Sequence, residues 1–146
     1  MAKLLETAQN AGNFNTLIKV AEAAGLIDTI KEADSLTVFA PTDDAFNKLP
    51  KSTLDELLQD IPKLKRIVAY HAVFGDVRSD DLVQIDEAPT VEGSILAIES
   101  SDGKVKVNEA NVLQTDILAD NGVIHVIDEV LIPTLVTVEY SKTKHT

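Results

Sequence analysis

The stretch NGVIHVIDEVLIP, residues 121–133, places a histidine in the middle of a run of branched apolar side chains. If these residues form a strand, His125 shares one face with Val123 and Ile127, because side chains alternate along a strand. Burial of an imidazole without hydrogen-bond partners costs roughly 1–3 kcal/mol, and burial also lowers the pKa of the ring. We therefore interpret His125 as a neutral structural residue that ties the strand to a neighbouring loop.

The rest of the sequence gives little support to a catalytic or metal-binding role for this histidine. The chain has no cysteine, and the histidines His71, His125 and His145 lie at no i, i+4 spacing from one another, whereas a histidine metal site needs two or three suitably spaced ligands. Neither a G-x-S-x-G nucleophile motif nor a G-x-G phosphate-binding motif occurs. We expect no catalytic residue, no metal and no cofactor. The alternative left open is a small-ligand carrier or enzyme with a pocket near His71 and His125.

The composition suits one globular domain. With 146 residues, of which 45% are hydrophobic, the chain is long enough to bury one core. The net charge of −11 opposes binding to nucleic acid or anionic lipid, and an aromatic content of 4% without tryptophan leaves few side chains on which bases could stack. No apolar run reaches the roughly 18 residues that a membrane helix needs. We expect no nucleic-acid partner and no direct membrane insertion.

The N-terminal part of the chain predicts helices. Apolar residues recur at helical spacing over residues 14–24, with Asn13 as the expected N-cap and Gly25 as the expected C-cap residue. The apolar residues within 26–30 predict a second short helix.

A buried strand is predicted next, over residues 35–40, because this segment is apolar and β-branched. Pro41 is expected to end it, and Thr42 is expected to cap a short helix. Further helices are predicted to start near residues 52 and 62.

The pattern becomes mostly β from residue 89 onward. Residues 94–108 predict a hairpin that turns at 101–103, and residues 112–132 predict two or three strands with a turn at 120–122. Because helices come first and strands later, the order favours an α+β fold over a parallel βαβ fold.

We expect a single domain over residues 1–136 and a loose C-terminal tail over residues 137–146, where the apolar pattern stops. The first residues contain no long apolar segment of the kind found in a signal peptide. The chain is then either a cytoplasmic protein or a mature segment with a new start methionine, and the sequence leaves both open.

Three motifs, in this order, resemble those of fasciclin-type (FAS1) domains. SLTVFAPTDDAFNKLP, residues 35–50, is similar to the first signature of that family, and NGVIHVIDEVLIP is similar to the second. Between them AYHAVFG, residues 69–75, is similar to the central Tyr-His motif. The resemblance covers about residues 1–134 and looks most like a bacterial single-domain member.

This resemblance implies an α+β fold, a fasciclin-like twisted β-sandwich or wedge with N-terminal helices packed around it. It also implies that the two signatures form neighbouring core strands, so that most of their residues are structural. The signature positions to which we assign a structural role are Thr37, Phe39, Pro41, Thr42, Phe46, Gly122, His125 and Pro133.

The resemblance further implies a non-catalytic adhesion or interaction module that is secreted, periplasmic or on the cell surface. Its partner would be a cell-surface or matrix protein or a glycan. An exposed strand edge could also support a weak homo-oligomer. In animal members, integrin adhesion is attributed to the Tyr-His region and to an Asp-Ile pair, which match Tyr70, His71, Asp116 and Ile117 here. A structural role stays the alternative for these four residues.

Overall fold

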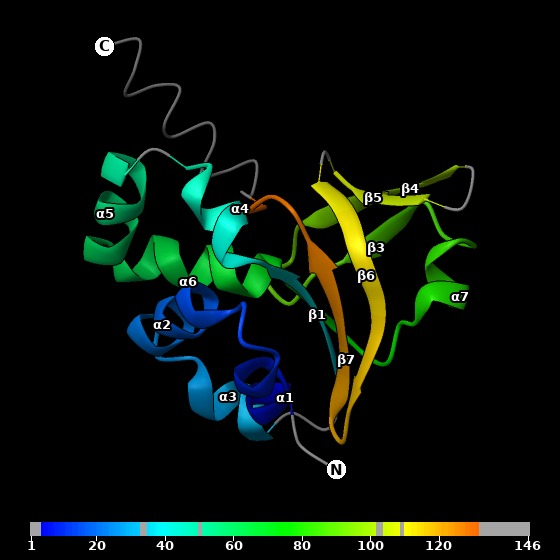
Figure 1. The fold of residues 1–146 in the computed structure, drawn as a ribbon, viewed down its shortest axis with the longest axis horizontal. Helices are drawn as coiled ribbons and strands as arrows, with labels where there is room; N and C mark the ends of the chain where they lie inside the picture. The colour runs from blue at the N-terminus through cyan, green and yellow to red at the C-terminus, as the bar shows by residue number, and fades with distance from the viewer. Residues whose placement is uncertain (1–3, 33–34, 50, 102–103, 109, 132–146) are drawn as a thin grey trace, which may run out of the picture.

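The computed structural model describes residues 4–32, 35–49, 51–101, 104–108 and 110–131. Most helices gather on one side of the molecule, and the strands lie on the other side together with a short helix at Ser79–Leu82, as Figure 1 shows, so the α+β prediction is confirmed. The expected loose tail and the signature residue Pro133 lie outside the described residues.

Helices come mostly before strands in chain order. The helices of the described residues are α1 (Leu4–Ala11), α2 (Asn15–Ala23), α3 (Ile27–Glu32), α4 (Asp43–Asn47), α5 (Lys51–Gln59), α6 (Ile61–Tyr70) and α7 (Ser79–Leu82). The strands are β1 (Leu36–Pro41), β2 (Ala72–Phe74), β3 (Glu87–Pro89), β4 (Ile95–Ser101), β5 (Lys104–Val107), β6 (Ala110–Ala119) and β7 (Gly122–Ile127).

In the described part of the chain the strands form one sheet, in the order β2-β1-β7-β6-β5-β4-β3. β1 and β7 run parallel, and the other neighbouring pairs are antiparallel. The parallel pair sets Phe39 of the first signature directly beside His125 of the second. The expectation that the two signatures are neighbouring strands is therefore confirmed.

Gly122, at the start of β7, is what permits this pairing. A Cβ atom built on Gly122 would lie 1.8 Å from the backbone oxygen of Leu36, far inside any contact distance. The Leu36 N–H also donates to the Asn121 oxygen at 3.1 Å, so the two strands begin in close backbone contact. Any larger residue at this position would push the strands apart, which is a common reason for a glycine within a strand.

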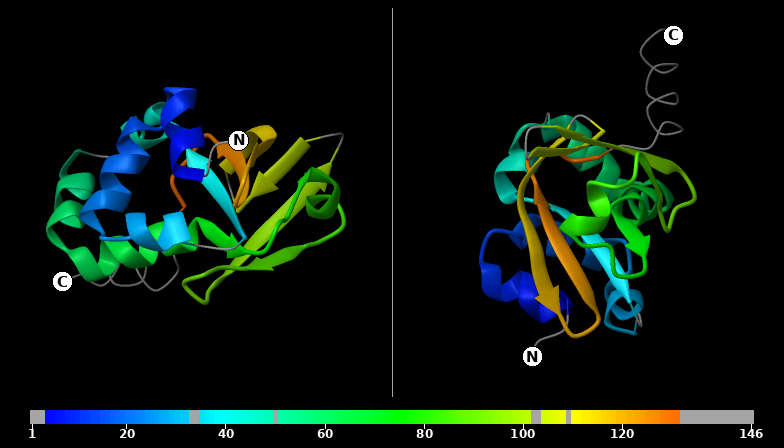
Figure 2. Two further views of the ribbon diagram at one scale, coloured as in Figure 1. Left: turned by 90° about the horizontal axis from the view of Figure 1, so that it is seen from below. Right: turned by 90° about the vertical axis from the view of Figure 1, so that its right-hand side faces the viewer.

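The sheet bends so that β3, β4 and β5 face β1 and β7 across an apolar core, which gives the wedge seen in Figure 2. Phe39, Val107 and Ile127 are fully buried within it. The other face of β1 and β7 packs against the N-terminal helices, where Leu4 meets Ile124. A third core lies among helices α2, α4, α5 and α6.

Helix α2 begins differently from the prediction. Its N-cap is Phe14 and not Asn13, and no N-cap side chain accepts a hydrogen bond there. Instead the Asp43 carboxylate accepts from the Thr16 N–H at 2.8 Å. The prediction was wrong because a distant segment supplies the acceptor. Gly25 follows the helix with a φ of 73°, a left-handed conformation that ends helices.

The first signature folds nearly as predicted. Thr42 caps α4, since its hydroxyl accepts from the Ala45 N–H at 3.1 Å. β1 spans Leu36–Pro41, one residue later at each end than the predicted range of 35–40, and it ends at Pro41, which lies opposite Ile127. The hairpin of β4 and β5 is confirmed, although residues 102–103 of its turn lie outside the described residues.

Candidate functional site

His71 lies where helix α6 ends and strand β2 begins, and it is only 3% exposed. The Leu131 N–H donates to its Nε2 atom at 2.8 Å. Because a backbone N–H only donates, Nε2 carries the lone pair and Nδ1 carries the proton, which it donates to the Ile67 oxygen at 2.6 Å. The ring therefore ties the end of α6 to the segment that follows β7, and both ring nitrogens are used.

Burial lowers the pKa of His71 from 6.5 to about 4, although the bond to the Ile67 oxygen acts in the opposite direction. The neutral ring offers one donor and one acceptor, which match its two backbone partners. A protonated ring would turn a second N–H towards the Leu131 N–H. A pKa so far below neutrality also makes the ring a weak proton acceptor for acid-base chemistry at neutral pH.

Tyr70 is also 3% exposed, and its hydroxyl joins two parts of the wedge. The hydroxyl donates to the Ile95 oxygen at 3.3 Å and accepts from the Asn108 side-chain amide at 3.0 Å. The oxygen of that same amide accepts from the Ala97 N–H at 2.9 Å. Sequence reasoning missed Asn108, whose signal was weak: asparagine tolerates the left-handed turn conformation that it adopts here, with a φ of 55°.

His125 is fully buried in β7 and holds a loop as well as a strand. Its Nδ1 atom accepts from the Asp116 N–H at 3.3 Å, so Nε2 carries the proton and donates to the Val77 oxygen at 2.7 Å. Burial lowers the pKa of His125, while the bond to Val77 and the nearby Asp116 carboxylate act to raise it. The proton is therefore on the opposite nitrogen from that of His71.

Thr37 of the first signature holds the same loop. Its hydroxyl donates to the Gly75 oxygen at 2.8 Å and accepts from the Val77 N–H at 2.8 Å. Both β1 and β7 thus fix residues 75–77 against the sheet. Among the other signature positions, Phe39, Pro41, Thr42, Phe46 and Gly122 are buried.

Asp116 lies at an irregularity of β6, where the pairing with β7 shifts register just before Ile117. Its φ is 58°, and its carboxylate accepts from both the backbone N–H, at 2.9 Å, and the hydroxyl of Ser79. Burial acts to raise the pKa of Asp116, but the bonds from Ser79 and the nearby His125 ring outweigh it, so the pKa is lowered. Ile117 is half-buried against the core behind the sheet.

The four residues matched to adhesion therefore separate into two places. Tyr70 and His71 are buried, and their polar atoms bond within the protein. Asp116 is exposed and Ile117 is half-buried on β6. The structure does not bring the two pairs together into one surface.

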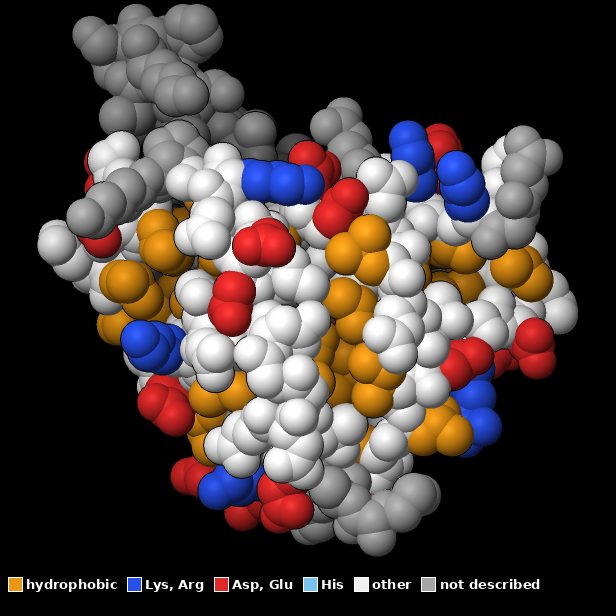
Figure 3. Space-filling view, in the orientation of Figure 1, with side chains coloured by type: hydrophobic (Ala, Val, Ile, Leu, Met, Phe, Trp, Pro, Cys, Tyr) orange, Lys and Arg blue, Asp and Glu red, His pale blue; other side chains and the backbone are white. Residues whose placement is uncertain are grey.

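Strand β6 also exposes apolar side chains, namely Leu113 at 59% and Leu118 at 44% exposure. We call Leu113, Asp116 and Leu118 the β6 surface. Figure 3 shows hydrophobic side chains in a band over β6 and β7 on this side of the molecule. The sequence predicted Leu113 and Leu118 only as parts of a strand, because their exposure depends on the bulges in β6.

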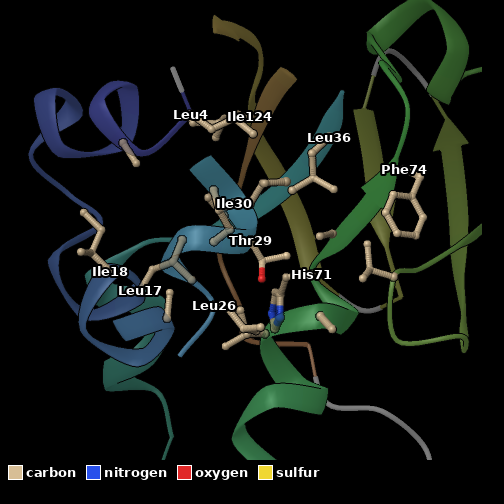
Figure 4. Close-up of a pocket in the computed structure, with 18 residues that line it drawn as sticks. Leu4, Leu17, Ile18, Leu26, Thr29, Ile30, Leu36, His71, Phe74 and Ile124 are labelled. Carbon is tan, nitrogen blue, oxygen red and sulfur yellow. The ribbon is translucent and has the colours of Figure 1, made fainter. Parts of the chain in front are cut away.

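One pocket lies between helices α1–α3 and strands β1 and β2, with a volume of about 160 Å³. Eighteen residues line it, and only Thr29 and His71 among them have polar side chains (Figure 4). The open alternative from the sequence was a pocket near His71 and His125. His71 lines this pocket, whereas His125 is not among the described residues that line it.

The described residues contain no group of three or more His, Asp or Glu side chains that could hold a metal ion. Within the same ranges, no helix has both the length and the apolar character required to cross a bilayer.

Comparison with known proteins identifies the family. The Fasciclin domain model matches residues 12–133. Two proteins of Synechocystis sp. are similar to this chain. The uncharacterized protein sll1735 is 44% identical over 132 residues, which cover 90% of this chain and 98% of that protein. Protein sll1483 is 41% identical over 134 residues, which cover 90% of this chain and 74% of that protein.

A solved structure has the same fold. It is a FAS1 domain pair from the insect cell adhesion molecule fasciclin I, which matches with a TM-score of 0.67 and 24% identity over 86% of this chain and 47% of that chain. The motifs, the parallel pairing of the two signature strands and these matches agree with one another: the chain belongs to the fasciclin domain family.

Proposed function

We propose that this protein is a non-catalytic adhesion or interaction module that acts on the cell surface or outside the cell. The fasciclin family is known for cell adhesion and for extracellular proteins, and the similar domain pair comes from a cell adhesion molecule. One observation carries the proposal for this chain. Tyr70, His71 and His125, the motif side chains best suited to chemistry, all bond within the protein.

The β6 surface is the proposed contact region. Leu113 and Leu118 offer apolar area, and the Asp116 carboxylate keeps lone pairs beyond those that Ser79 occupies. An exposed carboxylate on the same strand as exposed apolar side chains suits a partner that presents Lys or Arg near an apolar patch. We propose a cell-surface or matrix protein as the partner, and a glycan is the second candidate.

The edge of β6 supports only weak self-association. In the described residues β5 pairs with β6 at Ala110 and Asn111, so the remainder of β6 has one edge without a β5 partner. The two register shifts of β6 interrupt the regular row of backbone groups that another strand would need. We propose that the chain is at most a weak homo-oligomer through this edge.

Binding of the purified full chain to cells or envelope material from its source tests the proposal. The test variant is Leu113→Ser/Leu118→Ser, with thermal melting measured for each protein. The matched control is Val83→Ser/Ile95→Ser, because these side chains are 55% and 54% exposed and lie outside β6. We expect the test variant to keep its melting temperature and to lose most of its binding.

The control variant should keep both its binding and its melting temperature. Equal binding by all three proteins would contradict the β6 surface as the contact region. Failure of the wild-type chain to bind any envelope material would contradict the adhesion proposal itself. Fractionation of source cells with an antibody against the chain tests its location, and a wholly cytoplasmic signal would contradict a function at the surface.

A further inference from the structure

The pocket between the N-terminal helices and the sheet is lined almost entirely by apolar side chains, unlike the hydrogen-bonded groups around His71, His125 and Tyr70. Leu17, Leu26 and Ile30 come from the helical side, and Leu36 and Val91 come from the other side. Figure 4 shows the side chains of Leu17, Leu26, Ile30 and Leu36 around one space, with Phe74 at one side of it. Phe74 lines the pocket and is 71% exposed, so the lining reaches the surface at this ring, which we take as the opening of the pocket.

Water has little to bond with in this pocket. An ordered buried water needs two to four polar partners. The two ring nitrogens of His71 are already bonded to Ile67 and Leu131, which leaves the hydroxyl of Thr29 as the other polar side-chain group of the lining. An apolar occupant would restore the packing contacts that the lining atoms otherwise lack.

The volume sets the size of that occupant. A dry apolar cavity of about 150 Å³ binds molecules the size of benzene, whereas pockets for drug-sized ligands measure about 300–1,000 Å³. A pocket of about 160 Å³ therefore holds a benzene-sized group or a short stretch of a hydrocarbon chain. The rest of a longer molecule would leave through the opening beside Phe74.

The charge of the protein favours a neutral hydrocarbon ligand over an anionic one. No Lys or Arg is among the described residues that line the pocket, and the chain has a net charge of −11. Both facts disfavour a carboxylate at the opening. We propose that this pocket is a binding site for a neutral apolar molecule, with a hydrocarbon segment inserted between α1–α3 and the sheet. This site is separate from the β6 surface and does not depend on the adhesion proposal.

Titration of the full chain with 1-octanol and with octanoate at pH 8 tests the proposal. The readouts are the melting temperature and the backbone amide shifts in ¹H–¹⁵N spectra. We expect 1-octanol to raise the melting temperature and to shift the amides of Leu26, Ile30 and Val91. Octanoate should bind at least tenfold more weakly, because its carboxylate meets a negative protein without a basic partner.

Ala69→Leu is the test variant, since Ala69 lines the pocket, is only half-buried and lies in helix α6, which accepts leucine well. We expect it to weaken 1-octanol binding at least tenfold. Ala72→Leu fills the pocket from β2 and serves if the first variant does not fold. The matched control is Ala97→Leu, an exposed position on β4, which should bind as the wild type does.

Three results would overturn the proposal. The first is the absence of both a melting shift and a shift of the lining amides with 1-octanol. The second is unchanged binding in both pocket-filling variants. The third is a concentration-dependent dimer that Phe74→Ala dissociates, since a second copy of the chain would then cover the opening.

Discussion

The two motif histidines, His71 and His125, each connect two backbone segments through hydrogen bonds of both ring nitrogens, but the proton is on opposite nitrogens in the two rings. His71 links a helix end to the segment after β7, with its proton on Nδ1, whereas His125 links β7 to a loop and to β6, with its proton on Nε2. Each ring accepts from one backbone N–H and donates to one carbonyl. The difference shows that a histidine in a motif need not mark a reactive site, because a neutral ring is also a precise connector of two backbone segments.

The largest expected effect is that of His71→Ala. The substitution leaves the Leu131 N–H and the Ile67 oxygen without their partner and opens space beside the apolar pocket. We expect the free energy of unfolding to fall by about 3–4 kcal/mol in urea denaturation. His71→Gln places an acceptor near the Nε2 position and should lose less. A loss below about 1 kcal/mol for the alanine variant would contradict the role of His71 as a connector.

The second prediction is a loss of stability in mild acid. The pKa of His71 is about 4 in the folded chain and 6.5 as its ordinary value, so the fold favours the neutral ring. Its contribution is complete above pH 6.5 and is lost as the pH falls towards 4, up to about 3 kcal/mol. His125 acts in the same direction because its pKa is also lowered. Urea denaturation between pH 7.5 and 4.5 measures the loss.

His71→Gln is the control for the pH experiment, since its stability should fall less over the same range. Asp116 and Asp128 do not account for such a loss, because their pKa values are lowered from 3.8 and their contribution is lost only in stronger acid. A wild-type chain with constant stability from pH 7.5 to 4.5 would show that His71 is not buried in its neutral form.

Tyr70→Phe should lower the free energy of unfolding by less than His71→Ala or His71→Gln. It removes a hydroxyl that bonds to the Ile95 oxygen and to the Asn108 amide, while the ring keeps its place in the core. We expect a loss of about 1 kcal/mol in urea denaturation and no loss of adhesion. Adhesion that disappears with an unchanged melting temperature would make Tyr70 a contact residue.

The smallest stability effect is expected for Asp116→Ala, about 1 kcal/mol or less, because this carboxylate is exposed and its hydrogen bonds within the described part of the chain come from Ser79. Adhesion should nevertheless fall, since the carboxylate is part of the β6 surface. Binding and melting measured together separate the two roles. If adhesion falls only in proportion to a collapse of the fold, Asp116 is a structural residue and not a contact.

Much of the architecture could be predicted from sequence because local patterns determine it. The apolar and β-branched runs predicted β1 and β7, and Thr42 predicted the start of α4 as its N-cap. The N-cap of α2 could not be predicted, because Asp43 reaches it from another helix. The bonds of Asn108 and the bulge at Asp116 depend on how distant strands meet, and the local sequence carries little information about that.

The pocket likewise could not be predicted from the local sequence. The sequence associated a pocket with both histidines, yet its walls are mainly apolar residues that any core helix or strand would contain. Their arrangement around a space of about 160 Å³ arises only when α1–α3 pack beside β1 and β2.

The most direct test of the connector role is ¹⁵N NMR of the imidazole rings of the full chain. At pH 7 we expect two neutral rings with fixed and opposite proton positions, on Nδ1 in His71 and on Nε2 in His125. His71 should stay neutral when the pH is lowered to 5.5, since its pKa is about 4, and His125 should gain its proton only below pH 6.5. A ring that titrates near pH 6.5, or that exchanges between the two proton positions, would contradict this account and return that histidine to the candidates for chemistry.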